Sequence, residues 1–192
     1  TLLTLKKQHI MKKYLMTLAA VLCCAMTTTV FTACGSDDDD KSEPASNKPV
    51  AAVMDVTLSV SDDMVDKANL SVEYYDANGI VQTETLTKKD WTKSVQAKLP
   101  ATFGIRLMVK AKEGVDYASL EKFTESYTYS YSVYPVNASG TVLGGGKSGS
   151  SHSSLDIPGS KVAEWIADKS GGILKILYAV DANGQVTSGN WQ

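Results

Sequence analysis

Three aspartates close together in the sequence are the first candidates for chemistry. Asp62, Asp63 and Asp66 lie in one five-residue stretch. Paired carboxylates hydrolyse glycosides or bind calcium when the distance between them suits the reaction. The sequence does not give that distance, and a helical or turn-like linker with a solvated acidic face has the same composition. We favour the linker and keep calcium binding and glycoside hydrolysis as alternatives.

A histidine in a run of serines raises the question of a Ser–His pair. His152 is flanked by Ser148, Ser150, Ser151, Ser153 and Ser154. Catalytic triads are held by rigid scaffolds, and one common form places the serine in a Gly-x-Ser-x-Gly turn, which this sequence lacks. We therefore interpret the segment as a solvated loop.

A glycine-rich segment just before it, residues 144–149 (GGGKSG), matches the Gly-x-Gly-x-x-Gly phosphate pattern. That pattern binds phosphate because a helix N-terminus follows it, whereas SSHSSLDIPG follows here. The other phosphate loop needs a glycine five residues before Gly146, where Thr141 stands. The sequence predicts a flexible loop without a nucleotide.

The charges and metal-binding residue types of the chain exclude two further classes of function. From Cys34 onward there is one histidine and one cysteine, too few for a zinc site made of these residues. We expect no metal and no cofactor. The same stretch contains 15 of the 19 basic residues and all 21 acidic ones, so its net charge is 15 − 21 = −6. Nucleic-acid binding is not expected, because it depends on clustered lysine and arginine.

A row of tyrosines is the main candidate for a binding surface. Tyr127, Tyr129 and Tyr131 alternate with Thr128 and Ser130, which places three phenols on one face of a strand. Such a row stacks on sugars or contacts a partner, because tyrosine combines an apolar ring with a polar tip. The row also suits the rim of a core, and we favour burial. A further aromatic residue in polar surroundings completes the candidate ligand-binding set: Trp91.

The N-terminal part has the pattern of an export signal. Two lysines follow Met11, the expected true start, and eighteen uncharged, mostly apolar residues (14–31) and two small residues come next. This order is typical of a secretory signal peptide, which we place at residues 1–33. A transmembrane helix is the alternative. In both cases the lysines keep the N-terminus in the cytoplasm, and the body lies outside the inner membrane.

Residues 31–35 (FTACG) resemble the lipobox of bacterial lipoproteins, in which a small residue precedes a cysteine that accepts a diacylglyceryl group. Ala33 and Cys34 fit this pattern, and Phe31 stands where leucine is usual. The resemblance implies that Cys34 is lipidated and becomes the first residue of the mature chain. Acyl chains such as palmitate then hold it in the membrane, each buried CH₂ contributing about 0.8 kcal/mol.

The residues after Cys34 resemble the surface-export tag of many lipoproteins of the Bacteroidota: Ser36, Asp37, Asp38, Asp39 and Asp40. The resemblance implies a lipid-anchored protein of the outer membrane that faces the cell exterior. An acidic spacer extended by repulsion between like charges is the alternative. Residues 34–49 then form an acidic tether, and residues 50–192 form a single domain.

The body of the chain has the pattern of an all-β domain. Apolar residues alternate with others at residues 54–60, 70–74 and 103–111, and residues 173–180 are more continuously apolar. Turn residues at short spacing favour an antiparallel, immunoglobulin-like β-sandwich, with a β-barrel as the alternative. One short helix is expected at residues 160–169, capping an open end of the β structure.

A short repeat, Asp-Ala-Asn-Gly, occurs at residues 76–79 and 181–184. Aspartate bonds forward to the backbone and glycine accepts positive φ, so both copies are predicted to be hairpin turns. A calcium loop needs glycine at its sixth position and glutamate at its twelfth. Valine stands at the sixth in both copies, with Thr87 and Gln192 at the twelfth.

Together these patterns indicate a non-catalytic, lipid-anchored cell-surface protein that binds a glycan or a protein ligand. A structural component of a surface assembly or an adhesin is the alternative. A small hydrolase is a third hypothesis, which rests only on the aspartates near residue 62. The expected partners are the membrane, through the lipid anchor, and a glycan or an envelope protein.

Overall fold

The computed structural model describes residues 47–191 of the chain. The predicted signal peptide, the lipidation site Cys34 and the export tag at residues 36–40 lie outside the described residues. Between residues 47 and 191, no helix has the length and apolar character needed to cross a bilayer.

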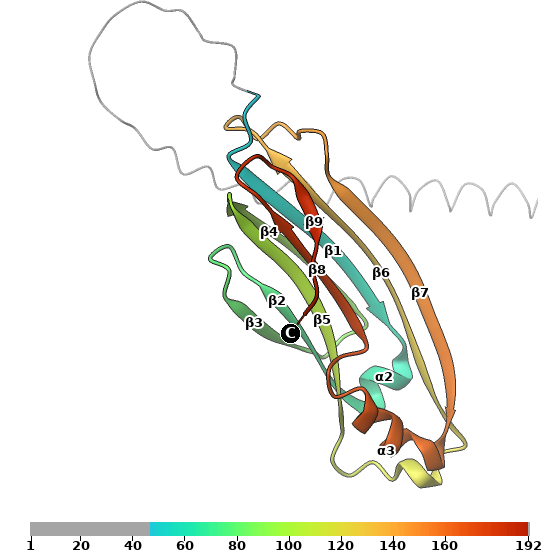
Figure 1. Ribbon diagram of the computed structural model, residues 1–192. Coiled ribbons are helices and arrows are strands. Elements are labelled where there is room, and N and C mark those ends of the chain that lie inside the picture. The colour runs from blue at the N-terminus through green and yellow to red at the C-terminus, as the bar shows by residue number, and fades with distance from the viewer. Residues whose placement is uncertain (1–46, 192) are drawn as a thin grey trace, which may run out of the picture. The chain divides into compact units, whose positions relative to one another are not determined.

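Two antiparallel sheets pack face to face around one core (Figure 1). The first sheet has the order β4-β1-β6-β7, and the second has the order β3-β2-β5-β8-β9. They are not closed into a barrel, so the predicted antiparallel β-sandwich is confirmed over the β-barrel. The first sheet comprises β1 (Ala51–Val60), β4 (Asp90–Lys98), β6 (Lys122–Val136) and β7 (Lys147–Pro158). The second comprises β2 (Ala68–Tyr75), β3 (Val81–Leu86), β5 (Ala101–Ala111), β8 (Leu174–Val180) and β9 (Val186–Ser188).

The core lies where the alternating apolar faces of the two sheets meet. Met54, Val56 and Leu58 of β1 face Phe103 and Ile105 of β5 in one buried cluster. Successive side chains of a strand point to opposite faces, so the runs predicted at residues 54–60, 70–74 and 103–109 each bury one side. Ala111, at the end of β5, is exposed.

Short helices gather at one end of the sandwich (Figure 1). They are α2 (Asp62–Lys67), the 3₁₀ turn η1 (Tyr117–Ser119) and α3 (Gly159–Asp168). α3 confirms the helix predicted at residues 160–169, and it buries Val162 and Ile166 against the end of the core.

The interpretation of the Gly- and Ser-rich segment around His152 as a loop is wrong. Residues 147–158 form β7, which pairs with β6 without interruption from Val133↔Lys147 to Lys122↔Pro158. Serine and glycine have low intrinsic strand preference, but that preference depends on context. Here the long strand β6 supplies a hydrogen-bond partner along the whole segment.

Both copies of the Asp-Ala-Asn-Gly repeat form the predicted hairpin turns. The Asp76 carboxylate accepts the backbone N–H groups of Asn78 and Ile80, each at 2.9 Å, and the Asp181 carboxylate accepts two in the same way. Asn137 begins a third turn of this kind, with its amide oxygen accepting from Ser139 and Thr141. Each turn ends in a glycine with φ between 74° and 79°.

Candidate functional site

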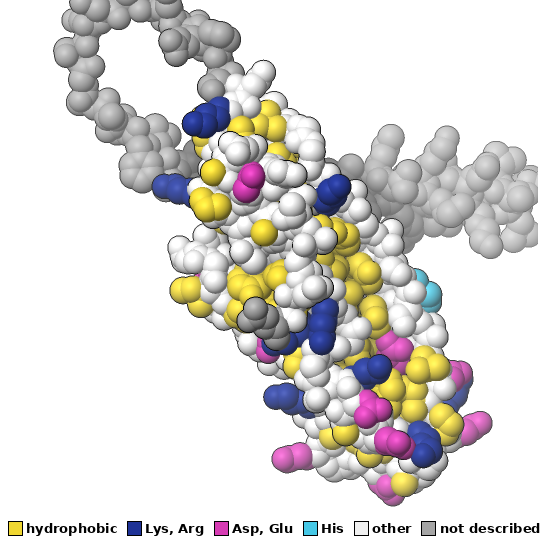
Figure 2. All heavy atoms as spheres, viewed as in Figure 1, with side chains coloured by type: hydrophobic (Ala, Val, Ile, Leu, Met, Phe, Trp, Pro, Cys, Tyr) yellow, Lys and Arg dark blue, Asp and Glu magenta, His cyan; other side chains and the backbone are white. Residues whose placement is uncertain are grey.

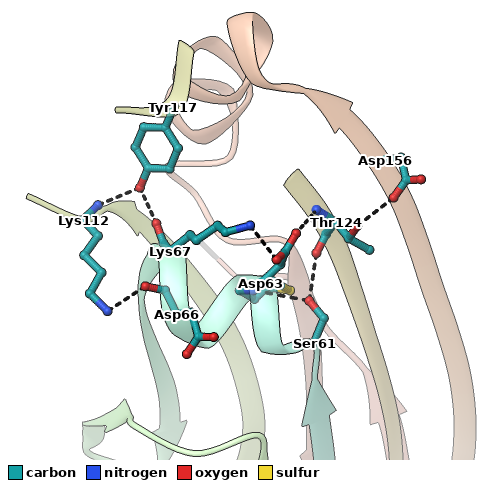
Figure 3. Close-up of polar contacts among 9 residues, drawn as sticks. Ser61, Asp63, Asp66, Lys67, Lys112, Tyr117, Thr124 and Asp156 are labelled. Carbon is teal, nitrogen blue, oxygen red and sulfur yellow. Dashed lines mark hydrogen bonds and ion pairs between the residues drawn. The ribbon is translucent and has the colours of Figure 1, made fainter. Parts of the chain in front are cut away.

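The three clustered aspartates all lie on α2, and they make different contacts. Figure 3 shows Asp63 and Asp66. The Asp63 carboxylate accepts from Lys67 Nζ at 2.7 Å and from the Thr124 backbone N–H at 2.8 Å. Partial burial alone raises the pKa of Asp63, but these hydrogen bonds outweigh it and hold the pKa below its ordinary value. Asp63 therefore joins α2 to β6 as a carboxylate.

The other two aspartates do not converge on Asp63. Asp62 pairs with Lys89 at 3.1 Å, and Figure 3 shows the Asp66 carboxylate turned away from Asp63. Within residues 47–191, no three His, Cys, Asp or Glu side chains are grouped to hold a metal ion. The structure thus agrees with the interpretation of this segment as a helical linker with an acidic face.

Trp91 lies on the inner face of β4 and takes part in a cluster centred on Glu84 of β3, here called the Glu84 cluster (Tyr74, Glu84, Trp91 and Lys93). The Glu84 carboxylate accepts from Tyr74 Oη and Trp91 Nε1, both at 2.8 Å, and from Lys93 Nζ at 2.5 Å. The bonds from Lys93, Trp91 and Tyr74 lower the pKa of Glu84 to about 2. The cluster ties β4 of one sheet to β2 and β3 of the other, so the Trp91 indole is half-buried rather than part of an exposed patch.

Tyr127, Tyr129 and Tyr131, here called the tyrosine ladder, lie on the inner face of β6. Neighbouring rings stack with centroids 6.3 and 6.4 Å apart, and all three pack against the core while remaining partly exposed. The Tyr131 and Tyr178 hydroxyls lie 2.6 Å apart, and Tyr127 Oη donates to the Ile173 carbonyl at 3.0 Å. Hydrogen bonds therefore hold the two outer rings, Tyr127 and Tyr131, at the margin of the core, and Tyr129 stacks between them.

The ladder stays partly exposed because neither neighbouring strand covers it. β9 pairs only with Tyr178, Ala179 and Val180, so most of β8 has no strand on its outer side. β7 presents the small residues Gly149, Ser151 and Ser153 on the inner face beside the rings. Figure 2 shows a band of hydrophobic side chains along this open side, between β8 and β7.

Glu125 continues the row of the tyrosine ladder and was missed at the level of sequence. It is 5% exposed, and Ser153 Oγ donates to its carboxylate over a long 3.5 Å. Burial raises its pKa. The signal was present in the sequence, because Glu125 precedes Tyr127 by two residues and so shares its face.

Two of the ladder tyrosines, Tyr127 and Tyr131, have a pKa above the ordinary value of a tyrosine. The hydrogen bond to Tyr178, together with burial, raises the pKa of Tyr131 to about 12. Burial raises the pKa of Tyr127 in the same direction. The Tyr127 and Tyr131 hydroxyls therefore stay protonated at neutral pH and act as hydrogen-bonding groups.

Part of the outer face of the first sheet carries a row of hydroxyl groups. Thr92, Thr57, Ser130 and Ser150 form one exposed row across all four strands, with 2.7 Å between the Thr57 and Ser130 oxygens. In the next row, His152 Nδ1 lies 3.1 Å from Thr128 Oγ1. His152 thus contacts a threonine across the strand, an arrangement that gives no support to Ser–His catalysis.

A shallow depression of about 390 Å³ lies elsewhere, between the ends of β5 and β8 and the β8–β9 turn. Asp181 is the one titratable side chain of its lining, and its carboxylate already holds the turn. The depression offers no paired groups for catalysis.

Comparison of the chain with protein-family models, with curated proteins and with solved structures found no match. The described structure is an antiparallel β-sandwich with a stacked tyrosine ladder on its open side.

Proposed function

We propose that this protein is a lipid-anchored outer-membrane protein that faces the cell exterior and binds a ligand without catalysis. The anchoring rests on the sequence pattern around Cys34. The observation that carries ligand binding is the tyrosine ladder, a stacked and partly exposed aromatic row that ends at the buried Glu125. Aromatic rings held by hydrogen bonds lose little entropy on binding, because their rotamers are already fixed.

The orientation of the rings favours a polypeptide ligand over a glycan. Tyr129 and Tyr131 are inclined by 17° and stacked on each other, so each ring faces its neighbour and turns its edge to the open side. A sugar packs best on a free ring face, whereas apolar side chains fit between ring edges. Ser151 and Ser153 line the same side and offer hydroxyl groups to a backbone.

Binding to arrays of extended peptides and of host and plant glycans, using the full lipidated chain in detergent, tests this proposal. Tyr129→Ala is expected to weaken binding about tenfold or more, as loss of a central aromatic contact does. Tyr134→Ala is the matched control, because Tyr134 lies on the outer face of the same strand. Failure to bind any array member, or equal loss in both variants, contradicts the proposal.

A structural role in a surface assembly is the second candidate. The long free edge of β7, which pairs with no strand except β6 among the described elements, favours it. Stoichiometric co-purification of other envelope proteins from membrane extracts supports this role, and recovery of the chain without them contradicts it.

A further inference from the structure

The two sheets have four edge strands, and three of these carry a feature that opposes pairing with another chain. β3 points Glu84 inward, β4 points Lys93 inward, and β9 is only three residues long. Inward-pointing charges and short length are devices by which natural sheets avoid edge-to-edge association.

The fourth edge, β7, has none of these features along most of its length. It is twelve residues long, it pairs with β6 without a bulge, and Pro158 is its last residue. Residues 148–155 (SGSSHSSL) have no formally charged side chain at neutral pH. In Figure 1, no described element lies on the outer side of β7.

The hydrogen bonds of the first sheet show which backbone groups of β7 face outward. Ser61 N donates to Ser126 O at 2.8 Å, so even-numbered residues of β6 bond to β1. Odd-numbered residues of β6 then bond to β7, since the two directions alternate along an antiparallel strand. The outward N–H and C=O groups of β7 are therefore those of its even-numbered residues: Ser148, Ser150, His152, Ser154 and Asp156.

We propose that this edge pairs with β7 of a second copy of the chain, antiparallel, about a two-fold axis at His152. Residues whose numbers sum to 304 then face each other, and five even-numbered pairs exchange about ten backbone hydrogen bonds. A two-fold axis normal to the sheet keeps the inner faces of both copies on the same side, giving one continuous eight-stranded sheet.

The register follows from the side chains of the inner face. Leu155 is 49% exposed, and in this register it faces Gly149 of the other copy. Gly149 has no side chain, and a Cβ built on it comes within 2.8 Å of the Tyr131 hydroxyl, so the Tyr131 ring lies beside this position. Each exposed leucine is thus covered by the Tyr131 ring of the partner.

The same register places no like charges opposite each other, so no charge repulsion opposes the pairing of the two β7 strands. Lys147 faces Ile157 of the partner, and Asp156 faces Ser148. On the outer face Ser150 lies opposite Ser154. The pairing involves the edge of β7 and not the ligand of the tyrosine ladder, so the dimer is expected whether or not the ladder binds a ligand.

Disulfide cross-linking of the full chain in cell membranes tests the pairing. His152→Cys is expected to form a disulfide dimer under mild oxidation, because residues of a hydrogen-bonded pair have Cα atoms about 5.5 Å apart, within disulfide range. Ser94→Cys, on the free edge of β4, is the matched control and is expected to give roughly tenfold less dimer. The unmodified chain sets the background from its own cysteines.

Charge variants test the register without disturbing the fold of one copy. In the His152→Cys background, Ser150→Glu with Ser154→Glu places like charges opposite each other and is expected to abolish the dimer. Ser150→Glu with Ser154→Lys places opposite charges there and is expected to retain it. Circular dichroism checks that both variants are folded.

Three outcomes overturn the proposal: His152→Cys gives no more dimer than Ser94→Cys, the two charge variants behave alike, or the cross-link joins the chain to a different protein. In the last case β7 accepts a strand from another partner and not from a second copy.

Discussion

At the scale of single residues, Glu84 is the side chain with the most concentrated set of contacts between the two sheets. Its carboxylate receives three hydrogen bonds from Tyr74, Trp91 and Lys93, and Lys93 Nζ also lies 4.2 Å from the centre of the Tyr74 ring. A carboxylate on edge strand β3 thus both blocks that edge and fixes the separation of the sheets. Protonation of Glu84 ends its ion pair with Lys93 and so weakens both effects.

Glu84→Gln is expected to lower the free energy of unfolding by about 1 kcal/mol at pH 7, a small value because the 40% exposed carboxylate is screened by water. The pKa of Glu84 is lowered from 4.5 to about 2. Its stabilisation is therefore complete above pH 4.5 and is lost as the pH falls towards 2. Urea denaturation from pH 7 to pH 2 measures this, and identical pH profiles for the two proteins contradict it.

Two glycines in otherwise equivalent turns are expected to respond differently to alanine. Gly79 and Gly184 have φ of 74° and 79°, so alanine costs about 1 kcal/mol at either position from the left-handed backbone alone. A Cβ on Gly79 meets nothing within 4 Å, whereas one on Gly184 lies 3.0 Å from Pro49 and 3.1 Å from Pro135.

Gly184→Ala is therefore expected to cost at least about 1 kcal/mol more than Gly79→Ala, because crowding adds to the backbone term. Thermal unfolding of the two variants side by side gives the difference. Equal melting temperatures are the result that this prediction does not allow.

At the scale of elements, α2 is six residues long and depends on its surroundings, since isolated helices of this length are unstable. Ser61 caps it, Asp63 ties it to β6, and Met64 is fully buried in the core. These contacts close one end of the sandwich.

Met64→Ala is expected to lower the free energy of unfolding by about 3 kcal/mol, the usual range for a buried methionine. Asp66→Ala is the control within the same helix and is expected to leave stability unchanged, because its side chain is exposed. Denaturant unfolding curves measure both. A large loss from Asp66→Ala would show instead that the acidic face carries an interaction of its own.

The sequence predicts the strands in which buried apolar residues alternate with others, such as β1, β2 and β5. β7 could not be predicted, because its serines gain their strand conformation from pairing with β6 rather than from local preference. The candidate site could likewise be predicted only in part. Alternation placed the tyrosine ladder on one face, but only the register shows that Trp91, Leu58 and Tyr129 form one row across the core.

At the scale of the whole molecule, the described chain begins at the end of the sandwich opposite the helices. Val50 N donates to Val136 O at 3.0 Å, and Gly184 lies against Pro49. α2 and α3 lie at the other end (Figure 1). The described chain therefore begins, at Asn47, beside the turns at Asn137 and Asp181.

Cys34→Ser is expected to move the protein from the membrane fraction to the soluble fraction, because a chain without acyl groups lacks the anchor. Cys23→Ser is the matched control and is expected to stay with the membranes. Immunoblots of fractionated cells measure the distribution, and protease added to intact cells reports whether the body faces outward. Retention of the Cys34→Ser protein in washed membranes contradicts lipid anchoring at this residue.

In the proposed antiparallel β7 dimer, the two Asn47 residues lie at opposite ends. The twelve residues from Gly35 to Ser46 reach at most about 40 Å, somewhat less than the roughly 50 Å covered by the fifteen residues of β6. If Cys34 carries the proposed lipid anchor and both anchors insert into one membrane, we expect the proposed dimer to lie flat on that membrane. A dimer that stands upright would need its two anchors in opposing membranes, so that β7 pairing would link two cells.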